Sequence, residues 1–426
     1  MSISVSVSYI LLPCLFIGSL LSLGLGQDPP RQWYKGNTHT HSLWSDGNDF
    51  PDMITDWYVQ AGYDFLALSD HNILSRGDKW MSNMAIQKRR QTLGKETLAK
   101  YVKHFGEEWV ETRGEGDSLE VRLKTLEEVR ARFEKPGEFL LMEAEEITDS
   151  FDRVIVNFDK PDNLEKVSVQ VHINALNVVE MIPPQHGDSP RETMRNNLLA
   201  VKAQEERTGK PMLAHLNHPN FMWSLTAEDL AHVVEEDFFE VYNGHPTINH
   251  LGDEKRPGDE RLWDIANTIR LTELQARPLF GLATDDSHQY HGGDVSPGRG
   301  WVMVHAAALE SDALVLSMRE GAFYASTGVL LADLDYSQDA KAIHFSIKAE
   351  LGVRYETEII GTRKATPEKV GETLAKIEGT DVHFPLTGDE LYVRAAVTAS
   401  ASHPNPSFEG QRLQAWTQPL GWSGDR

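Results

Sequence analysis

Short apolar runs, each bounded by polar residues, recur along much of this chain and constrain its fold more than any other feature. They occupy residues 65–68, 139–142, 212–214, 238–242, 279–283 and 301–304. Runs of this length suit strands that are buried on both faces, as in a parallel sheet. Helix-prone segments lie between them. This alternation predicts an α/β fold in which helices connect successive strands.

The segments between the runs carry recognisable helix ends. Ser189 is followed by a proline and, three residues on, by Glu192, which together form a helix start. Gly209 suits the residue just after a helix, because glycine adopts left-handed backbone conformations easily. Thr226 and Asp229 repeat the N-cap pattern. The sequence therefore predicts helices that begin at these caps.

Two regions depart from this alternation. Residues 73–137 are polar and rich in Lys, Glu and Arg, which predicts a helical insertion with solvated charged faces that covers one end of the sheet. After residue 332 the apolar residues alternate with a period of two, which predicts antiparallel strands. We expect three parts: a leader at 1–26, a main domain at 27–332 and a β-rich C-terminal domain at 333–426.

Composition limits the partners of the chain. Its 426 residues include 41 basic and 64 acidic side chains, giving a formal charge of -23. Such a charge repels phosphate backbones, so we expect no nucleic-acid partner. A hydrophobic content of 40% fits a folded globular protein. We therefore expect a small-molecule substrate; the oligomeric state does not follow from composition.

The first 26 residues have the pattern of a signal peptide. Residues 10–25 are almost wholly apolar, and small residues precede Gln27, as a cleavage site requires. This pattern predicts a periplasmic or secreted protein. No Lys or Arg precedes the apolar run, so an uncleaved membrane anchor stays an alternative. Cys14, the single cysteine, lies inside this segment, so cleavage leaves no thiol for a disulfide or for catalysis.

The strongest chemical motif is the pair His39 and His41. Strand side chains alternate between faces, so histidines one residue apart point the same way and can share one ion. Further metal-type side chains stand at or just beyond later apolar runs: Asp70, His71, Glu146, His172, His218, Asp286 and His288. In β/α barrels the functional residues come from the carboxyl ends of several strands. The repeated placement therefore predicts a polynuclear metal site.

Glu146 is the predicted bridge between two ions. Glu143 and Glu145 compete with it, but alternation places both on the opposite face of an extended strand. The set of His, Asp and Glu without Cys suits borderline and hard divalent ions such as Zn, Mn or Fe.

Two other positions also have competitors. His218 is preferred to His215, because a proline follows it directly and a rigid loop can present its ring. Asp286 is preferred to Asp285, because it stands one residue from another histidine, His288. These choices complete the predicted ligand set.

Taken together, the motifs resemble the polymerase-and-histidinol-phosphatase (PHP) superfamily. They are His39-x-His41 with 45–47, then 68–72, the Glu-Glu-Ile-Thr segment at 145–148, 217–219 and 286–288. The long insertion and the segments 241–246 and 324–328 resemble its extracytoplasmic, carbaryl-hydrolase-like branch. The resemblance implies a distorted seven-stranded (β/α)7 barrel that holds two or three divalent ions.

The resemblance also implies a distribution of ligands. His39, His41, Glu146 and Asp286 would hold one ion, Glu146, His172 and His218 a second, and Asp70, His71 and His288 would complete the cluster. Asp46 stands where some members place a ligand of a third ion.

Such a cluster predicts hydrolysis. Two ions bridged by a carboxylate lower the pKa of a shared water from 15.7 toward ~7, so hydroxide is present at neutral pH. Neither a Gly-x-Ser-x-Gly motif with partners nor a glycine-rich phosphate loop occurs in the sequence. We expect Asp70 or a neighbouring histidine to carry the proton.

The substrate is less constrained. A phosphoester is the superfamily expectation, and Arg299 either holds an anionic oxygen or forms a structural ion pair. Asn243 and His245 either line the pocket mouth or form a turn before Pro246. A carbamate, ester or amide is equally compatible with the chemistry. A secreted binding protein without catalytic activity is the alternative from another class.

Overall fold

The computed structural model of the protein describes residues 30–89, 96–156, 164–337 and 339–422, so the predicted leader lies outside the described residues. Arg31–Arg426 forms one compact unit. Its helices are α1 (Pro51–Gln60), α2 (Asn83–Lys88), α3 (Thr97–Phe105), η1 (Gly116–Ser118), α4 (Leu126–Phe133), α5 (Pro190–Thr208), α6 (Ala227–His232), α7 (Asp259–Ile269), η2 (Arg270–Leu274) and α8 (Ser311–Arg319). Among the described residues, no helix has both the length and the apolar character that crossing a bilayer needs.

Nineteen strands make up the sheets of the described chain. They are β1 (Gln32–Asn37), β2 (Phe65–Leu68), β3 (Lys79–Ser82), β4 (Thr112–Arg113), β5 (Glu120–Leu123), β6 (Leu140–Val156), β7 (Leu164–Leu176), β8 (Leu213–Leu216), β9 (Phe238–Asn243), β10 (Phe280–Thr284), β11 (Trp301–Ala306), β12 (Phe323–Ser326), β13 (Leu331–Ala332), β14 (Ala342–Ile347), β15 (Tyr355–Arg363), β16 (Glu372–Glu378), β17 (Asp381–Pro385), β18 (Glu390–Ser402) and β19 (Arg412–Thr417).

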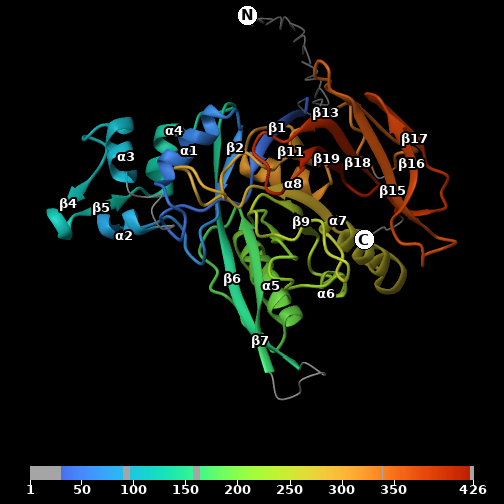
Figure 1. Ribbon diagram of the computed structural model, residues 1–426, viewed down its shortest axis with the longest axis horizontal. Helices are drawn as coiled ribbons and strands as arrows, with labels where there is room; N and C mark the ends of the chain where they lie inside the picture. The colour runs from blue at the N-terminus through green and yellow to red at the C-terminus, as the bar shows by residue number, and fades with distance from the viewer. Residues whose placement is uncertain (1–29, 90–95, 157–163, 338, 423–426) are drawn as a thin grey trace, which may run out of the picture. The chain divides into compact units, whose positions relative to one another are not determined.

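One mixed sheet of 13 strands dominates the unit (Figure 1). Its order is β10-β9-β8-β7-β6-β2-β1-β11-β12-β19-β18-β15-β16. The pairs β1–β2, β2–β6, β8–β9 and β9–β10 are parallel. Strands β6 and β7 form a long antiparallel hairpin, and β7 also pairs antiparallel with β8. The predicted apolar runs thus become strands, but only part of the sheet is parallel.

The helices begin where their caps predict. The Ser189 side chain accepts a hydrogen bond from the backbone N–H of Glu192 at the start of α5, and Gly209 ends that helix at a φ of 69°. Helices α5, α6 and α7 pack their apolar residues against β7 and β9, for example Leu198 and Trp263 against Phe239. This cluster anchors the strands that carry several predicted ligands.

Pairing continues beyond the carboxyl ends of β1 and β10. The segments that follow them are joined by a parallel bridge between Thr40 and Ser287. The N–H of His41 donates to the carbonyl of Ser287 at 3.0 Å, and the N–H of Asp286 donates to the carbonyl of His39 at 3.0 Å. The first and the last predicted ligand segments are therefore neighbours.

The insertion is mixed rather than wholly helical, which corrects the sequence-based expectation. It contains α2, α3 and α4 together with a small antiparallel sheet in the order β3-β5-β4. Its apolar residues, among them Tyr101, Phe105 and Val121, pack on Leu43 and Phe50 from the loop after β1. Apolar residues interspersed among the charged residues of the insertion therefore form a second small core.

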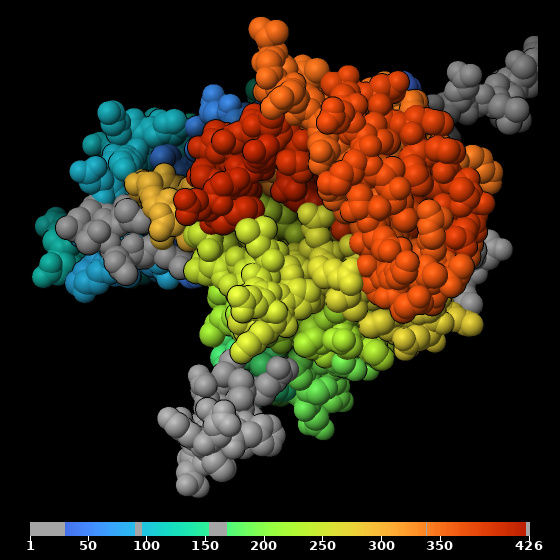
Figure 2. Space-filling model, turned by 45° about the vertical axis from the view of Figure 1, so that its right-hand side comes forward, coloured from blue at the N-terminus to red at the C-terminus, as the bar shows by residue number. Residues whose placement is uncertain are grey.

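The strands after residue 332 are antiparallel, as the period-two pattern predicts. β15, β16, β18 and β19 belong to the large sheet through the pairing of β19 with β12, whereas β14 and β17 form a separate sheet with β13. Arg394 on β18 is buried and donates to both carboxylate oxygens of Asp264 on α7, at 2.9 and 2.8 Å. Figure 2 shows these orange strands in contact with the yellow segment around α7. The amide side chain of Gln418 bonds both backbone groups of Gly281, which covers the edge strand β10.

The structure shows a mixed α/β fold but not the closed (β/α)7 barrel that the resemblance implies. A barrel needs a continuous ladder, whereas β10 is one edge of the 13-strand order and β16 is the other. β6 and β7 pair with each other in antiparallel register, whereas neighbouring strands of a β/α barrel are parallel. The apolar runs reveal buried strands, but they do not encode whether a connection is a crossover or a turn.

Candidate metal centre

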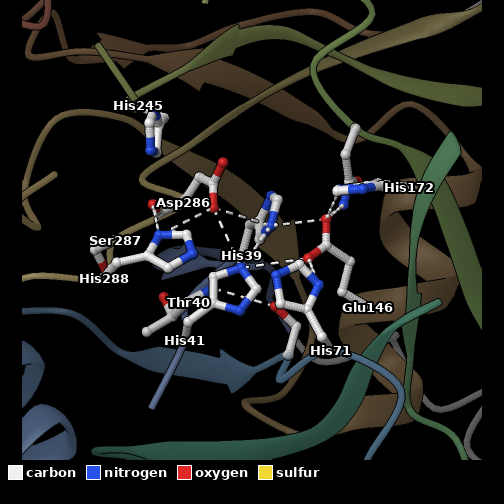
Figure 3. Close-up of polar contacts among 12 residues, drawn as sticks. His39, Thr40, His41, His71, Glu146, His172, His245, Asp286, Ser287 and His288 are labelled. Carbon is white, nitrogen blue, oxygen red and sulfur yellow. Dashed lines mark hydrogen bonds and ion pairs between the residues drawn. The ribbon is translucent and has the colours of Figure 1, made fainter. Parts of the chain in front are cut away.

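Side chains from six segments of the large sheet converge on one place. His39 and His41 follow β1, His71 follows β2, Glu146 lies on β6 and His172 on β7, His218 follows β8, and Asp286 and His288 follow β10 (Figure 3). The carboxyl ends of the parallel strands all lie at this edge of the sheet. Six imidazoles and three carboxylates form four overlapping groups in which one ligand atom per residue lies within 4.8 Å of the others.

The first group contains His39, His41 and Glu146. The two Nε2 atoms lie 3.1 Å apart, and both are close to Asp286 Oδ1, at 3.3 and 3.2 Å. Glu146 Oε1 lies 3.3 Å from His39 Nε2, and Oε2 lies 3.4 Å from His41 Nε2. The two histidines therefore point the same way, as the alternation of strand side chains predicts, although they lie just beyond β1.

The second group contains His39, His218 and Asp286. His218 and Asp286 both have a positive φ, 26° and 46°, which non-glycine residues rarely adopt. Each such residue costs about 1–3 kcal/mol, and they gather at functional sites. The turn at Pro219 directs His218 into the cluster, which His215 on the strand itself does not reach.

Glu146 is the centre of the third group, with His71 and His172. Its Oε1 lies 3.0 Å from His172 Nδ1, and its Oε2 lies 2.7 Å from His71 Nδ1. Asn217 also donates to Oε1, at 2.8 Å. Each oxygen of this carboxylate thus faces a different set of imidazoles, which is the arrangement of a bridging ligand.

The fourth group contains His41, Asp46, His71 and His288. Asp46 Oδ1 lies 3.2 Å from His288 Nε2 and 3.5 Å from His71 Nε2. His288 donates from Nδ1 to the carbonyl of Asp286 at 2.8 Å, so its Nε2 is left to face Asp46. Asp46 thereby takes a place in the cluster.

The donor set fits divalent cations. Neutral imidazoles and carboxylates without thiolates suit Zn, Mn or Fe. His39 donates from Nδ1 to the buried carboxylate of Glu240 at 2.7 Å, which turns Nε2 toward the cluster in the tautomer that binds metal. Because His41 and His71 each belong to two groups, the four groups do not add up to four ions.

The cluster is buried, and its charges are strongly coupled. Burial opposes ionisation of Glu146, but the imidazoles of His71 and His39 outweigh it and hold the pKa of Glu146 well below its usual range. The pKa of Asp286 is lowered in the same way, chiefly by His39. Burial and the neighbouring imidazoles lower the pKa of His41 to about 3. Ionised carboxylates and a deprotonated His41 are the ligand states that a cation requires. Against the effect of burial, Asp286 raises the pKa of His39 and Glu146 raises that of His71, so these two rings would release a proton when a cation binds.

Asp70, a predicted ligand and proton carrier, belongs to none of the four groups among the described residues. Both of its carboxylate oxygens accept hydrogen bonds from the loop after β1. Oδ1 accepts from the N–H groups of Ser42 and Ser45, at 2.8 and 3.0 Å, and Oδ2 accepts from the Ser42 hydroxyl at 2.6 Å. The structure therefore gives Asp46 the place in the cluster that the sequence argument gave to Asp70.

Arg299 likewise lies outside the cavity. It is 4% exposed, and its guanidinium donates to the carbonyl of Gly244 at 2.8 Å and to Asn405 Oδ1 at 3.2 Å. The backbone N–H of Arg299 donates to Asp285 Oδ1 at 2.6 Å. This residue holds the loop after β9, and it contacts neither the cluster nor the cavity.

The acids that compete with the predicted ligands, Glu143, Glu145 and Asp285, point away from the cluster. Glu145 accepts from the N–H of Ile182 at 2.6 Å, and Glu143 pairs with Arg76. Both lie on the face of β6 opposite Glu146, as alternation predicts. Asp285 accepts from the Tyr58 hydroxyl at 2.7 Å and from backbone groups after residue 297.

A cavity of about 220 Å³ opens onto the cluster. Beyond the ligands, its lining consists of Phe221, His245 and Ile248. The Thr247 hydroxyl and N–H both contact His245 Nδ1, at 2.8 and 3.3 Å. His245 therefore lines the cavity, while Asn243 lies below it and bonds Glu240 and Asp286.

Sequence reasoning missed Glu240, a buried acid beneath the cluster. It is 1% exposed on β9 and accepts four hydrogen bonds. The available signal was a lone glutamate inside the apolar run 238–242, where a charge needs buried partners.

Comparison with known proteins finds only distant similarity. No family model and no curated protein matches the chain. A two-domain protein from Bacteroides vulgatus, described as containing a predicted PHP-like metal-dependent phosphoesterase, is 13% identical, covers 92% of this chain and 97% of its own, and has a TM-score of 0.38. PsfC from Pseudomonas syringae is 12% identical over 67% of this chain and 88% of its own, at 0.30. A candidate metal-dependent phosphoesterase from Bifidobacterium adolescentis is 14% identical over 62% and 89%, at 0.26. Similarities this distant assign no function to the chain.

Proposed function

We propose that this protein is a metal-dependent hydrolase of the PHP type that cleaves a small phosphoester. The observation that carries the proposal is the convergence of six imidazoles and three carboxylates, from six sheet segments, on one cavity. A structural role for so many buried ionisable groups is costly, because each must be desolvated. The phosphoester preference comes from the motifs that resemble the superfamily.

The residues around the cavity would have separate roles in the hydrolysis. Divalent cations in this cluster would activate water by lowering its pKa toward ~7 and stabilise negative charge that develops on the substrate. Glu146 would hold two ions through its two oxygens, as its contacts with His172 and His71 suggest. Phe221 and Ile248 would exclude bulk water from one wall, which strengthens electrostatic interactions in the cavity. His245 would offer a proton or a hydrogen bond to the substrate from the rim.

Two ions are the minimum that the ligand groups favour, and Asp46 supports a third. Asp46 and His288 form a ligand pair at 3.2 Å on the side of the cluster away from His172. We propose Zn, Mn or Fe in these positions. Elemental analysis of the purified protein measures the number directly, and fewer than one ion per chain would favour a binding protein without catalytic activity.

One observation favours a second substrate class. Among the described residues, those that line the cavity include neither Arg nor Lys, and Phe221 and Ile248 give it an apolar wall. A phosphate dianion would then be held by the ions alone, whereas a neutral ester, amide or carbamate, as in the carbaryl-hydrolase-like branch, would suit this lining directly. We keep this class as the alternative reaction of the same site.

A substrate panel separates these reactions. The metal-loaded protein should be assayed with p-nitrophenyl phosphate, a p-nitrophenyl phosphodiester, p-nitrophenyl acetate and a p-nitrophenyl carbamate. We expect the phosphate compounds to be hydrolysed fastest, and a preference for acetate or carbamate would support the alternative. His41→Ala should abolish hydrolysis while circular dichroism stays unchanged, because the ring binds ions and carries little of the core. Turnover retained in this variant would contradict the site assignment.

We also propose that β1, β2, β6, β7, β8, β9 and β10 correspond to the distorted seven-stranded barrel. The support is the bridge between Thr40 and Ser287, which brings the two ends of this seven-strand series together at the metal edge. The apolar segment 10–25 supports a location outside the cytoplasm. Sequencing the N-terminus of the exported protein tests that location.

A further inference from the structure

Two buried carboxylates lie directly beneath the cluster without joining any of its ligand groups. Glu240 is 1% exposed, and Asp70 is also 1% exposed. Each accepts four hydrogen bonds, and nearly all of the donors belong to ligand residues or to the loops that carry ligands. Their partners differ completely.

Glu240 contacts the members of one group. Its Oε1 accepts from His39 Nδ1 at 2.7 Å, and its Oε2 accepts from the backbone N–H of His218 at 2.8 Å. Oε2 also accepts from Asn243, whose amide in turn donates to Asp286 Oδ2 at 3.2 Å. His39, His218 and Asp286 are the second ligand group, and the last two have strained backbones.

Asp70 contacts a different segment. Its four donors are the N–H and hydroxyl groups of Ser42 and Ser45, at 2.5–3.0 Å. These serines flank the turn between His41 and Asp46, two members of the fourth ligand group. The turn is otherwise held by N–H groups of residues 45 and 47 bonded to the Ser42 carbonyl. Removing Asp70 would leave this turn without its buried anchor.

From these contacts we infer that Glu240 and Asp70 are positioning residues that assemble separate ion sites. Glu240 builds the site of His39, His218 and Asp286, and Asp70 builds the site that contains Asp46. The inference rests on the metal centre of the proposed function but not on its hydrolytic activity. It makes the ions separable: each carboxylate controls the affinity of one of them.

The variant Glu240→Gln tests this inference because it should change which nitrogen of His39 carries the proton. Two N–H donors face Oε2, so the amide oxygen of glutamine must stay there, and its NH₂ group then faces His39 Nδ1. His39 must accept at Nδ1 and carry its proton on Nε2, the atom that points into the cluster. A protonated Nε2 binds no ion. Loss of such an outer partner lowers metal affinity by about 10–100-fold.

The experiment compares Glu240→Gln, Asp70→Ala and wild type. Metal-free protein is titrated with Zn²⁺ in competition with a chromophoric chelator, and crystals of each loaded protein are examined by anomalous scattering. We expect Glu240→Gln to weaken one ion about 10–100-fold, with reduced occupancy beside His218, and Asp70→Ala to weaken a different ion, beside Asp46. A general structural role would weaken all ions together.

Glu236→Gln is the matched control. It makes the same substitution just before β9, at the end away from the cluster, on a buried acid whose Oε1 accepts the N–H groups of Asp237 and Phe238. A glutamine oxygen keeps these bonds, so ion binding should equal that of wild type. If Glu240→Gln does not fold, Asn243→Ser removes the amide that links Glu240 to Asp286 and accepts from the His245 N–H, and it should weaken the same ion to a smaller extent.

Several outcomes overturn the inference. These are loss of the same ion in Glu240→Gln and Asp70→Ala, wild-type affinity for every ion in Glu240→Gln, or unchanged affinity beside His218 in Asn243→Ser. Wild-type protein that takes up no Zn²⁺ would instead refute the proposed function. The two failures are therefore distinguishable.

Discussion

Replacing Arg394 by leucine should destabilise the protein more than most single substitutions. The side chain is 1% exposed, and its guanidinium forms a two-pronged pair with Asp264 and a further bond to Glu260 at 2.9 Å. It also lies 4.7 Å from the centre of the Trp263 ring. Burial opposes its charge, but Asp264 and Glu260 raise the pKa of Arg394, so it stays cationic.

The size of the destabilisation depends on the carboxylates that lose their partner when Arg394 is replaced. Removing one partner of a buried ion pair costs about 3–5 kcal/mol, because the other charge stays buried and unpaired. The Asp264 side chain is 5% exposed, whereas that of Glu260 is 37% exposed and can be hydrated. The Tyr392 hydroxyl still donates to Asp264 at 2.8 Å. We therefore expect the low end, about 3 kcal/mol, out of a typical total of about 5–15 kcal/mol.

Urea unfolding followed by tryptophan fluorescence measures this loss from the shift of the midpoint at a shared slope. The double variant Arg394→Leu, Asp264→Leu removes both charges and should recover most of the stability. The exposed pair of Arg207 and Glu180 supplies the control, since Arg207→Leu should change stability by less than about 0.5 kcal/mol. A single variant as stable as wild type, or a double variant less stable than the single one, would refute the reasoning.

Three further predictions concern pH, metal and packing. Burial raises the pKa of Asp52 to about 6, so the folded state keeps a proton that the unfolded state has released, and stability falls between about pH 4 and 6. Relative to Asp52→Asn, wild type should lose about 2 kcal/mol between pH 4 and pH 7 in urea titrations, and parallel pH curves would contradict this. Stripping ions with a chelator should lower the melting temperature, since a ligand at 100 times its Kd adds about 2.7 kcal/mol; calorimetry with Zn²⁺ added back checks this, and an unchanged transition would speak against bound ions. Gly36→Ala would place a Cβ 2.1 Å from the buried Phe65 ring, so it should cost about 1–3 kcal/mol in urea unfolding, and a neutral result would show that the ring can move.

The positions of the buried strands were predictable, because short continuous apolar runs rarely form any other structure. Their connections were not. Polar residues dominate 145–153 of β6, so no apolar run marks this part of the strand, and pairing direction depends on contacts far apart in sequence. Whether such a sheet closes into a barrel is a tertiary property of the same kind.

The cluster was predictable to the extent that ligands follow strands. Most of the predicted ligands meet, because carboxyl ends of neighbouring strands share an edge. The resemblance already pointed to Asp46 as a ligand of a third ion, but the position of Asp70 outside the ligand groups was not predictable, since it depends on how the loop after β1 folds back onto β2. Spacing alone does not distinguish an acid that holds an ion from an acid that holds a loop. The role of Glu240 could not be predicted for the same reason.

The bridge between Thr40 and Ser287 has a consequence for how the protein matures. The two segments that it joins stand at opposite ends of the α/β region, so the cluster is incomplete until β10 has docked beside β1. A growing or partly folded polypeptide would present scattered, low-affinity histidines and carboxylates. Divalent ions would therefore bind tightly only at the end of folding, and their binding would indicate that the chain has finished folding.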